Sequence, residues 1–288
     1  MTVPVLNASG CLDALTAPEV ARSLDAFVTK TVTPLPREGN EPPRFAETDR
    51  GMLNSIGLQN PGIDAFVANV LPRLHELGVQ IWVSVGGFSA ADYASVCERL
   101  DACDAVGVIE LNLSCPNVEE APETAAELVQ RARAATSKPL YAKLSPATQD
   151  IAETARAVVA AGADGLSLVN TIRALALDRR TLAPALGRGA GGYSGPALGP
   201  VALACVFACA QAVEVPIVGM GGVSSGSDAV ALIAAGASAI ALGTILFSDP
   251  AAPGRVRNEM AAEATARGHE SAAAIRGAAH DIGVAVVS

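Results

Sequence analysis

Residues 160–168 read AAGADGLSL, and residues 234–242 read AAGASAIAL. In each copy, alanines end a helical stretch, a glycine follows where helices are commonly capped, and a short apolar run has the character of a buried strand. A repeated unit of helix, turn and strand is the building block of a parallel sheet with helices packed on it. This stretch therefore predicts an α/β fold.

On either side of the repeat, short apolar runs alternate with helical patterns, about eight times along the 288 residues. The expected strands are Pro4–Asn7, Phe27–Thr31, Ile81–Val85, Val108–Leu113, Leu140–Leu144, Leu166–Val169, Ile217–Met220 and Ala239–Leu242. The expected helices are one starting at a capping box over Thr16–Glu19, then Ile63–Leu77, Ala90–Leu100, Glu123–Ala135, Ile151–Ala161, Val201–Val213 and Asp228–Ala235, with Gly162 and Gly236 as C-terminal caps. Eight units favour a closed (β/α)8 TIM barrel, one domain over residues 1–288, with a doubly wound open sheet as the alternative.

Composition and charge exclude several classes of protein. The chain is 50% hydrophobic with a net charge of −9, so it offers no basic surface for nucleic acid or an anionic membrane. No apolar run is long enough to span a bilayer, and the first ten residues do not resemble a secretory signal. We expect a cytoplasmic protein.

The six cysteines form no C-x-x-C pair, so a zinc or iron–sulfur site on this chain is not expected. Cys205 and Cys209 lie four residues apart in an apolar helical run, where packing is the simple interpretation. Lysine use is more informative, because only three of the twenty basic residues are lysines. Two of them, Lys30 and Lys143, lie in apolar, strand-like segments. A buried lysine is costly unless an anion or cofactor meets it, although a lysine at a strand end can also reach solvent.

Two connections are too long for simple turns. Thr33–Pro61 and Thr171–Gly199 have no clear periodicity, and both follow a strand. Long structureless connections in a compact domain are usually functional, and the carboxyl ends of the strands are the face on which barrel enzymes build their active sites. We expect both connections to contribute to a site rather than to mark a domain boundary.

Glycines follow the last two strands. The sequence GMGGV covers residues 219–223, and Gly243-Thr244 follows the eighth strand. Glycine lets backbone N–H groups approach an anion closely, and the loops after strands seven and eight are the usual phosphate site of such barrels. Tight turns would have the same composition, but the position of both loops favours phosphate binding.

Asparagines gather at other strand ends. They occur in ELNLSCPN (residues 110–117), in MLNSIGLQN (residues 52–60) and at Asn170, before Thr171. Amide side chains can match the donors and acceptors of a polar heterocycle in a dry pocket. Cys115 lies where a barrel places catalytic residues, although a lone cysteine can also be an inert thiol.

At these residues the sequence resembles the dihydroorotate dehydrogenase family, and within it the heteromeric, NAD-linked branch. The matching stretches are Asn7–Gly10, Pro36–Asn40, Met52–Gly62, Glu110–Asn117, Tyr141–Pro146, Gly192–Pro196, Pro216–Val223 and Ala241–Thr244. NSIGLQNPG and LNLSCPN are the specific parts. The resemblance implies an FMN-containing barrel that interconverts dihydroorotate and orotate, with a homodimeric core and a separate electron-transfer subunit carrying FAD and a [2Fe–2S] cluster.

The resemblance also implies roles for individual residues. Cys115 would be the catalytic base, and Lys30 would contact both FMN and the substrate carboxylate. FMN would be held by Ser9, Lys30, Thr31, Asn112, Lys143, Val169, Gly195, Gly221, Gly222, Gly243 and Thr244. The substrate would be lined by Lys30, Asn54, Ser55, Ile56, Gly57, Leu58, Asn112, Asn170 and Thr171. No metal site is implied.

Three features depart from the family pattern. The glycine-rich lid expected after SCPN is replaced by VEEAPE (residues 118–123), Ser84 stands where the family usually has an asparagine, and the start of the chain is short. These departures leave open an FMN-dependent barrel acting on another dihydropyrimidine, or a degenerate FMN-binding homologue. A Schiff-base aldolase using Lys143 is a further alternative on the residues alone.

Overall fold

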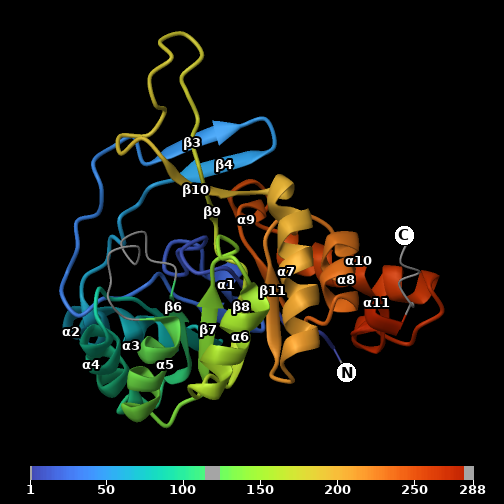
Figure 1. The fold of residues 1–288 in the computed structure, drawn as a ribbon, viewed down its shortest axis with the longest axis horizontal. Coiled ribbons are helices and arrows are strands. Elements are labelled where there is room, and N and C mark those ends of the chain that lie inside the picture. Colours follow the sequence, from blue (N-terminus) through green and yellow to red (C-terminus); the bar gives the residue numbers. More distant parts are fainter. Residues whose placement is uncertain (1, 114–123, 282–288) are drawn as a thin grey trace.

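The computed structural model describes residues 2–113 and 124–281 (Figure 1). Eight parallel strands close a barrel in the order β1-β12-β11-β8-β7-β6-β5-β2. Their bounds are β1 Val5–Asn7, β2 Ala26–Val28, β5 Gln80–Val85, β6 Val106–Asn112, β7 Leu140–Leu144, β8 Gly165–Leu168, β11 Ile217–Met220 and β12 Ala239–Leu242. The expected TIM barrel is confirmed, and all eight expected strands are present.

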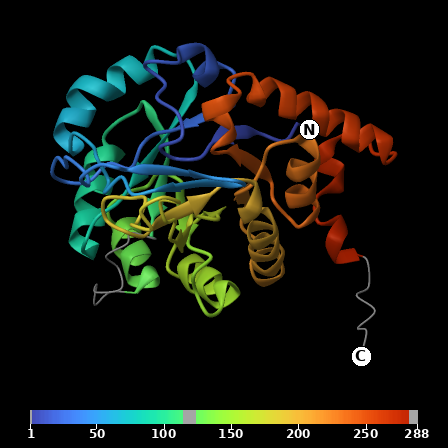
Figure 2. The ribbon, with the colours of Figure 1, turned by 90° about the horizontal axis from the view of Figure 1, so that it is seen from above.

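Helices surround the barrel, as the view from above shows (Figure 2). They are α1 Pro18–Arg22, α2 Ile63–Ala65, the π-helix η1 Phe66–Val70, α3 Leu71–His75, α4 Ala90–Asp101, α5 Ala125–Ala134, α6 Ile151–Ala160, the 3₁₀ turn η2 Pro196–Leu198, α7 Gly199–Ala212, α8 Gly226–Ala234, α9 Ile245–Ser248, α10 Ala252–Ala266, the 3₁₀ turn η3 Ala272–Ile275 and α11 Ala278–Asp281. None of the described helices has both the length and the apolar character needed to cross a membrane.

Two apolar layers hold the barrel together. One lies between strands and helices and includes Ile109, Leu166 and Val206, all fully buried. The other fills the barrel interior, where Leu6, Val28 and Trp82 pack together. Burial of apolar surface on this scale is the main stabilising contribution to such a fold.

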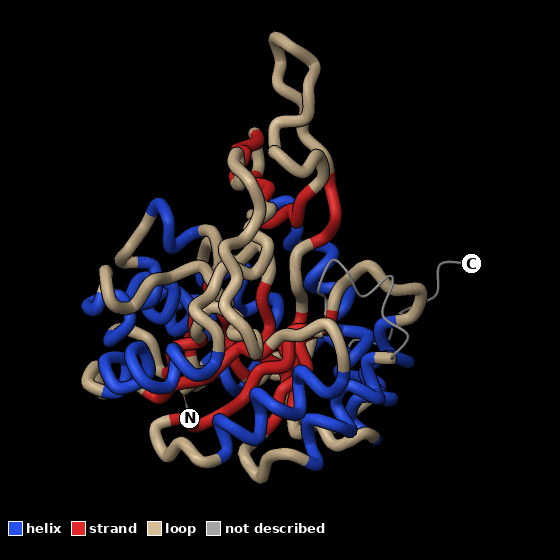
Figure 3. The backbone as a smooth tube through the Cα atoms, turned by 90° about the vertical axis from the view of Figure 1, so that its left-hand side faces the viewer, coloured by secondary structure: helices blue, strands red, loops and turns tan. Residues whose placement is uncertain are grey.

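The two long connections are not structureless, which corrects the sequence-based expectation. Each contributes two strands, β3 Phe45–Thr48 with β4 Gly51–Asn54, and β9 Ile172–Ala174 with β10 Gly191–Ser194. They form one antiparallel sheet in the order β3-β4-β10-β9. The sheet lies beyond the carboxyl ends of the barrel strands, and the connection between β9 and β10 projects further (Figures 1 and 3). β3 and β4 form a local hairpin, but β4 pairs with β10 across more than a hundred residues, and strands this short leave little local signal.

Two local expectations differ from the structure. The capping box over Thr16–Glu19 is wrong, because Ala17 is the N-cap and the Thr16 hydroxyl instead donates to the carbonyl of Asp13. Strand β2 ends at Val28, so Lys30 follows the strand rather than lying within it. Gly162 and Gly236 follow their helices with φ of 110° and 119°, as expected of C-terminal caps.

Candidate active site

A chain of polar side chains crosses the carboxyl end of the barrel. The Oγ1 of Thr31 lies 3.1 Å from the Oγ of Ser84 and accepts a hydrogen bond from Asn112 Nδ2 at 3.2 Å. Asn112 Oδ1 in turn accepts from Asn170 Nδ2 at 2.9 Å. These residues come from four different strands or strand ends, so the network fixes their amide groups at one rim of the barrel.

Ser84 takes part in this network although it departs from the family pattern. It is fully buried on β5, its backbone N–H donates to Thr29 Oγ1 at 3.2 Å, and its hydroxyl meets Thr31. The serine therefore fits its position through hydrogen bonds to the segment after β2.

Lys143 lies inside the barrel beneath this rim. Its side chain on β7 is 6% exposed, and its Nζ lies 3.5 Å from Oε1 of Glu110, whose side chain is 1% exposed. Glu110 Oε1 accepts no hydrogen bond from the described residues, so the contact is an ion pair without hydrogen-bond geometry. Ser167, the neighbour of Lys143 in the strand register, also has a buried hydroxyl without a hydrogen-bond partner in the described residues. This region is thus buried, polar and charged.

Lys30 lies at the same end of the barrel, after β2. A Cβ added at Gly10 would lie 3.1 Å from Lys30 Nζ, so the lysine passes over the glycine of the segment after β1. Ser9, one residue earlier, donates from its hydroxyl to the carbonyl of Thr29 at 2.7 Å. Glycine suits position 10, where φ is 77° and a side chain would press on this lysine.

The segment Asn54–Leu58 is held by polar contacts from the first long connection. Asn40 Nδ2 donates to Ser55 Oγ at 2.9 Å, and the Asn40 backbone N–H donates to the Ile56 carbonyl at 2.9 Å. A Cβ at Gly57 would lie 2.5 Å from Asn40 Oδ1, so this asparagine packs directly on the glycine. Asn54, at the end of β4, donates to the carbonyl of Gly192 at 3.2 Å.

The remaining predicted residues lie around the same end. Thr171 packs on Gly192, since a Cβ there would lie 2.2 Å from the Thr171 hydroxyl oxygen. Val169 follows β8, is buried, and donates its N–H to the carbonyl of Met220. Gly195, with φ of 115°, approaches Gly51 so closely that a Cβ would lie 2.5 Å from its Cα.

The glycine loops after β11 and β12 border a cavity of about 140 Å³, lined by Pro196, Gly222, Val223, Ser224, Thr244, Ile245 and Ser248. Gly221 and Gly222 have successive positive φ values of 110° and 80°, which turns the backbone sharply after the strand. Within the described chain, the N–H groups of Gly222, Val223 and Thr244 donate to no other backbone or side-chain group. Free amides around a small cavity suit an anion such as a phosphate.

A larger cavity of about 250 Å³ lies at the opposite end of the barrel, bordered by Trp82 and Tyr141, far from these groups along the strands.

Cys115, the expected base, lies outside the described residues. Cys11 is the thiol that the structure places near the two lysines. Burial raises its pKa, while the charges of Lys143 and Lys30 act in the opposite direction. Cys205 and Cys209 are buried, as the packing interpretation predicted, and burial raises the pKa of Cys209 to about 12.

Sequence reasoning assigned no role to Glu110, Asn40 or Asn7. Asn7 is fully buried and uses its amide to bridge β1 and β2, accepting from the Val28 N–H at 2.8 Å and donating to the Val28 carbonyl at 2.7 Å. Its signal was a polar residue at the end of an apolar strand. For Glu110 the signal was a carboxylate inside an apolar strand, where a buried charge needs a cation.

The family model for dihydroorotate dehydrogenase matches residues 1–263. The protein of Halalkalibacterium halodurans named "Dihydroorotate dehydrogenase B (NAD(+)), catalytic subunit" is 44% identical over 262 residues, covering 87% of this chain and 85% of its own. Its namesake from Desulforudis audaxviator is 42% identical over 292 aligned residues, covering 97% and 94%. A crystal structure of DHODH from Eimeria tenella in complex with ferulenol shares the fold, with a TM-score of 0.79 at 22% identity, over 96% of this chain and 85% of that one. The chain therefore belongs to the dihydroorotate dehydrogenase family.

Proposed function

We propose that this chain oxidises dihydroorotate to orotate, as the FMN-binding catalytic subunit of an NAD-linked enzyme. The observation that carries the proposal is the arrangement at the carboxyl end of the barrel. There, a cavity lined by free backbone amides, a buried lysine and a ring of asparagines occur together in a chain of this family.

The residues present fit FMN. The cavity at Gly222, Val223 and Thr244 has the size and the donors for a phosphate, and Lys143 supplies a cation deeper in the barrel. We assign Ser9, Lys30, Thr31, Asn112, Lys143, Val169, Gly195, Gly221, Gly222, Gly243 and Thr244 to the flavin. When bound, the flavin supplies the hydride acceptor that the reaction needs.

The substrate side is formed by Lys30 and by amide groups. Dihydroorotate carries a carboxylate, which the Lys30 ammonium can pair with. Its ring amides match the donors and acceptors of Asn112 and Asn170, which are already fixed by a 2.9 Å hydrogen bond to each other. Asn54, Ser55, Ile56, Gly57, Leu58 and Thr171 complete the proposed lining. Fixed donors and acceptors of this kind discriminate against rings that lack the matching groups.

The proposed base is Cys115, which takes a proton from one ring carbon while the neighbouring carbon gives up a hydride. Only a thiolate can accept that proton, so the reaction depends on deprotonation of the thiol. Lys143, with Glu110 beneath it, would place positive charge where the reduced ring gains negative charge.

The proposed assembly rests on the family resemblance and on the names of the relatives, which are catalytic subunits of NAD(+)-linked enzymes. We infer a partner subunit carrying FAD and a [2Fe–2S] cluster, a homodimeric core and a cytoplasmic location. The acidic surface of the chain suits none of the nucleic-acid roles.

The test is the absorption spectrum of the purified chain, followed by anaerobic addition of dihydroorotate. We expect a flavin spectrum, release of FMN on denaturation, and bleaching of the flavin band by dihydroorotate. Bleaching by dihydrouracil but not by dihydroorotate would assign a different dihydropyrimidine. A bound flavin that no dihydropyrimidine bleaches would mean a degenerate homologue, and a chain that takes up no flavin would overturn the proposal.

A further inference from the structure

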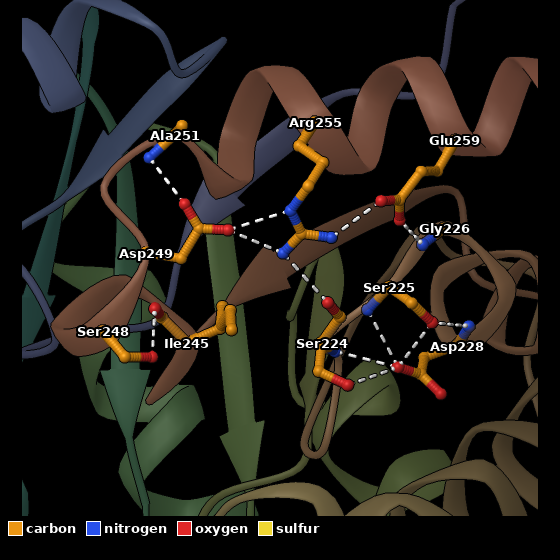
Figure 4. Close-up of polar contacts among 10 residues, drawn as sticks. All are labelled: Ser224, Ser225, Gly226, Asp228, Ile245, Ser248, Asp249, Ala251, Arg255 and Glu259. Carbon is orange, nitrogen blue, oxygen red and sulfur yellow. Dashed lines mark hydrogen bonds and ion pairs between the residues drawn. The ribbon is translucent and has the colours of Figure 1, made fainter.

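Arg255 on α10 links three parts of the structure next to the glycine loops (Figure 4). Its Nε donates to Asp249 Oδ2 at 2.8 Å, its Nη1 to Glu259 Oε1 at 2.8 Å, and its Nη2 to the Ser224 carbonyl at 3.1 Å. Ser224 follows the glycines after β11, and Asp249 caps the end of α9, which follows Thr244. One guanidinium therefore spans the loops on both sides of the phosphate-sized cavity.

The amides at the start of α8 are already occupied. Asp228 Oδ2 accepts from the N–H groups of Ser224 and Ser225, both at 2.9 Å, and Glu259 Oε2 accepts from the Gly226 N–H at 2.7 Å. An anion would therefore find these three amides already bonded to carboxylates. The amides of Gly222, Val223 and Thr244, in contrast, bond to no other group of the described chain, and they lie on the two loops that Arg255 connects.

The charges around Arg255 indicate that it does not bind an anion directly. Its cation is balanced by Asp249 and Glu259, with ion-pair distances of 2.8 Å to each. Hydrogen bonding to Arg255 and to the Gly226 amide lowers the pKa of Glu259 below its ordinary value. Because two carboxylates already pair with the guanidinium, it connects the two loops and is not available to bind an anion.

Resting on the proposed function, we propose that Arg255 is a positioning residue for the flavin phosphate. It fixes the spacing between the Gly222–Ser224 loop and the Thr244–Asp249 segment, so that amides from both loops face one anion. The planar guanidinium suits this role because its donors leave in three fixed directions, which a lysine ammonium on a flexible stem does not reproduce.

The test compares Arg255→Met with Arg257→Met. Arg257 lies on the same helix and also makes one ion pair and one carbonyl contact, to Asp25 at 2.9 Å and to Ser23 at 3.2 Å, but at the other end of the barrel. Each variant removes one arginine from α10; Arg255→Met removes two ion pairs and Arg257→Met removes one. The measurements are the dissociation constants of FMN and of riboflavin, which has no phosphate, by quenching of flavin fluorescence on flavin-free protein.

We expect Arg255→Met to weaken FMN binding by about tenfold or more, the scale on which outer partners of a binding site act. Riboflavin binding should change little in that variant, and Arg257→Met should change neither. Equal weakening of FMN and riboflavin, or unchanged FMN affinity, would overturn the positioning role. Wild-type protein without FMN affinity would instead refute the proposed function itself, so the two failures are distinguishable.

Two further variants keep the test decisive if Arg255→Met does not fold. Arg255→Lys retains the charge but not the three directions of donation. Asp249→Asn retains an acceptor for the Ala251 N–H, which bonds Asp249 Oδ1 at 3.0 Å, and removes the charge that Arg255 pairs with. Both should show a partial loss of FMN affinity with riboflavin affinity unchanged. Full FMN affinity in both folded variants would contradict the proposal.

Discussion

Lys143 Nζ lies 3.5 Å from Glu110 Oε1 inside the barrel, where both side chains are almost fully buried. Removing one partner of such a pair leaves the other charge buried without compensation. We therefore expect Glu110→Gln to lower the free energy of unfolding of the flavin-free protein by about 3 kcal/mol. Urea unfolding at pH 7 measures it.

The control for this prediction is a double-mutant cycle with Lys143→Met. The double variant should be less destabilised than the sum of the two single variants, because the second substitution removes the uncompensated charge. Additive losses would show that Glu110 and Lys143 do not act as a pair. A flavin-free sample is used so that the result is independent of cofactor affinity.

Much of this site could be predicted from the sequence, and the reasons differ between its parts. The barrel and the residues after its strands follow from periodicity, since Asn112, Lys143 and Gly222 occupy strand ends that the apolar pattern already marks. The antiparallel sheet of β3, β4, β10 and β9 could not be predicted, because β4 and β10 pair across more than a hundred residues. The Arg255 network was missed because its contacts to Asp249 and to the Ser224 carbonyl join separate elements, whereas the pair with Glu259 has the ordinary i,i+4 spacing of a helix.

Gly222 and Gly243 differ as test positions for the phosphate site. A Cβ at Gly222 would lie 2.6 Å from the backbone of Gly199, and its φ is 80°, so any side chain there disturbs the fold itself. A Cβ at Gly243 meets nothing closer than 3.9 Å, from Ala8 and Cys11. We expect Gly243→Ala to retain flavin and Gly243→Glu to lose it through like-charge repulsion and bulk. Flavin content per folded chain measures this, and full occupancy in Gly243→Glu would place the phosphate elsewhere.

Asp228 makes stability at the start of α8 depend on pH. Its burial acts to raise the pKa, but hydrogen bonds from Ser224 and Ser225 outweigh it, and the pKa is lowered from 3.8. A lowered native pKa contributes stability that is present above 3.8 and is lost as pH falls through the native value. Asp228→Asn should therefore cost about 1 kcal/mol at pH 7, the usual scale of an N-terminal cap, and progressively less below the ordinary value. Urea unfolding of wild type and Asp228→Asn at pH 7 and at a pH below 3.8 measures this. An equal loss of unfolding free energy at the two pH values would contradict the charge-based account.

Electron transfer to NAD should require a second protein. Within the described residues no group of three metal-binding side chains could hold a cluster, and the sequence has no C-x-x-C pair. We expect the chain alone to be reduced by dihydroorotate but to reduce NAD slowly. The measurement is NADH formation under anaerobic conditions with and without an added FAD and [2Fe–2S] subunit. Rapid NADH formation by the chain alone would refute the proposal that a second subunit transfers the electrons to NAD.

Cys115 and Cys11 are the two thiols to be separated in the proton-transfer step. Cys115 belongs to the LNLSCPN motif directly after β6, whereas the structure places Cys11 near Lys30 and Lys143, with a pKa that burial raises. A thiol with a raised pKa is a poor source of thiolate at neutral pH. Cys115→Ala should therefore bind FMN normally but slow flavin reduction by dihydroorotate by about a hundredfold or more, the usual effect of losing a general base.

Cys11→Ala is the matched control, and it should reduce within a few-fold of wild type. The wild-type rate should rise with pH toward the thiol pKa, about 8.5 for an unperturbed cysteine, because only the thiolate accepts the proton. The rate in Cys115→Ala should lose this dependence. Anaerobic stopped-flow reduction of the flavin across pH 6–10 measures all three proteins. If Cys11→Ala is the slow variant and Cys115→Ala reduces at the wild-type rate, the base is Cys11, the thiol near the two lysines, and not Cys115.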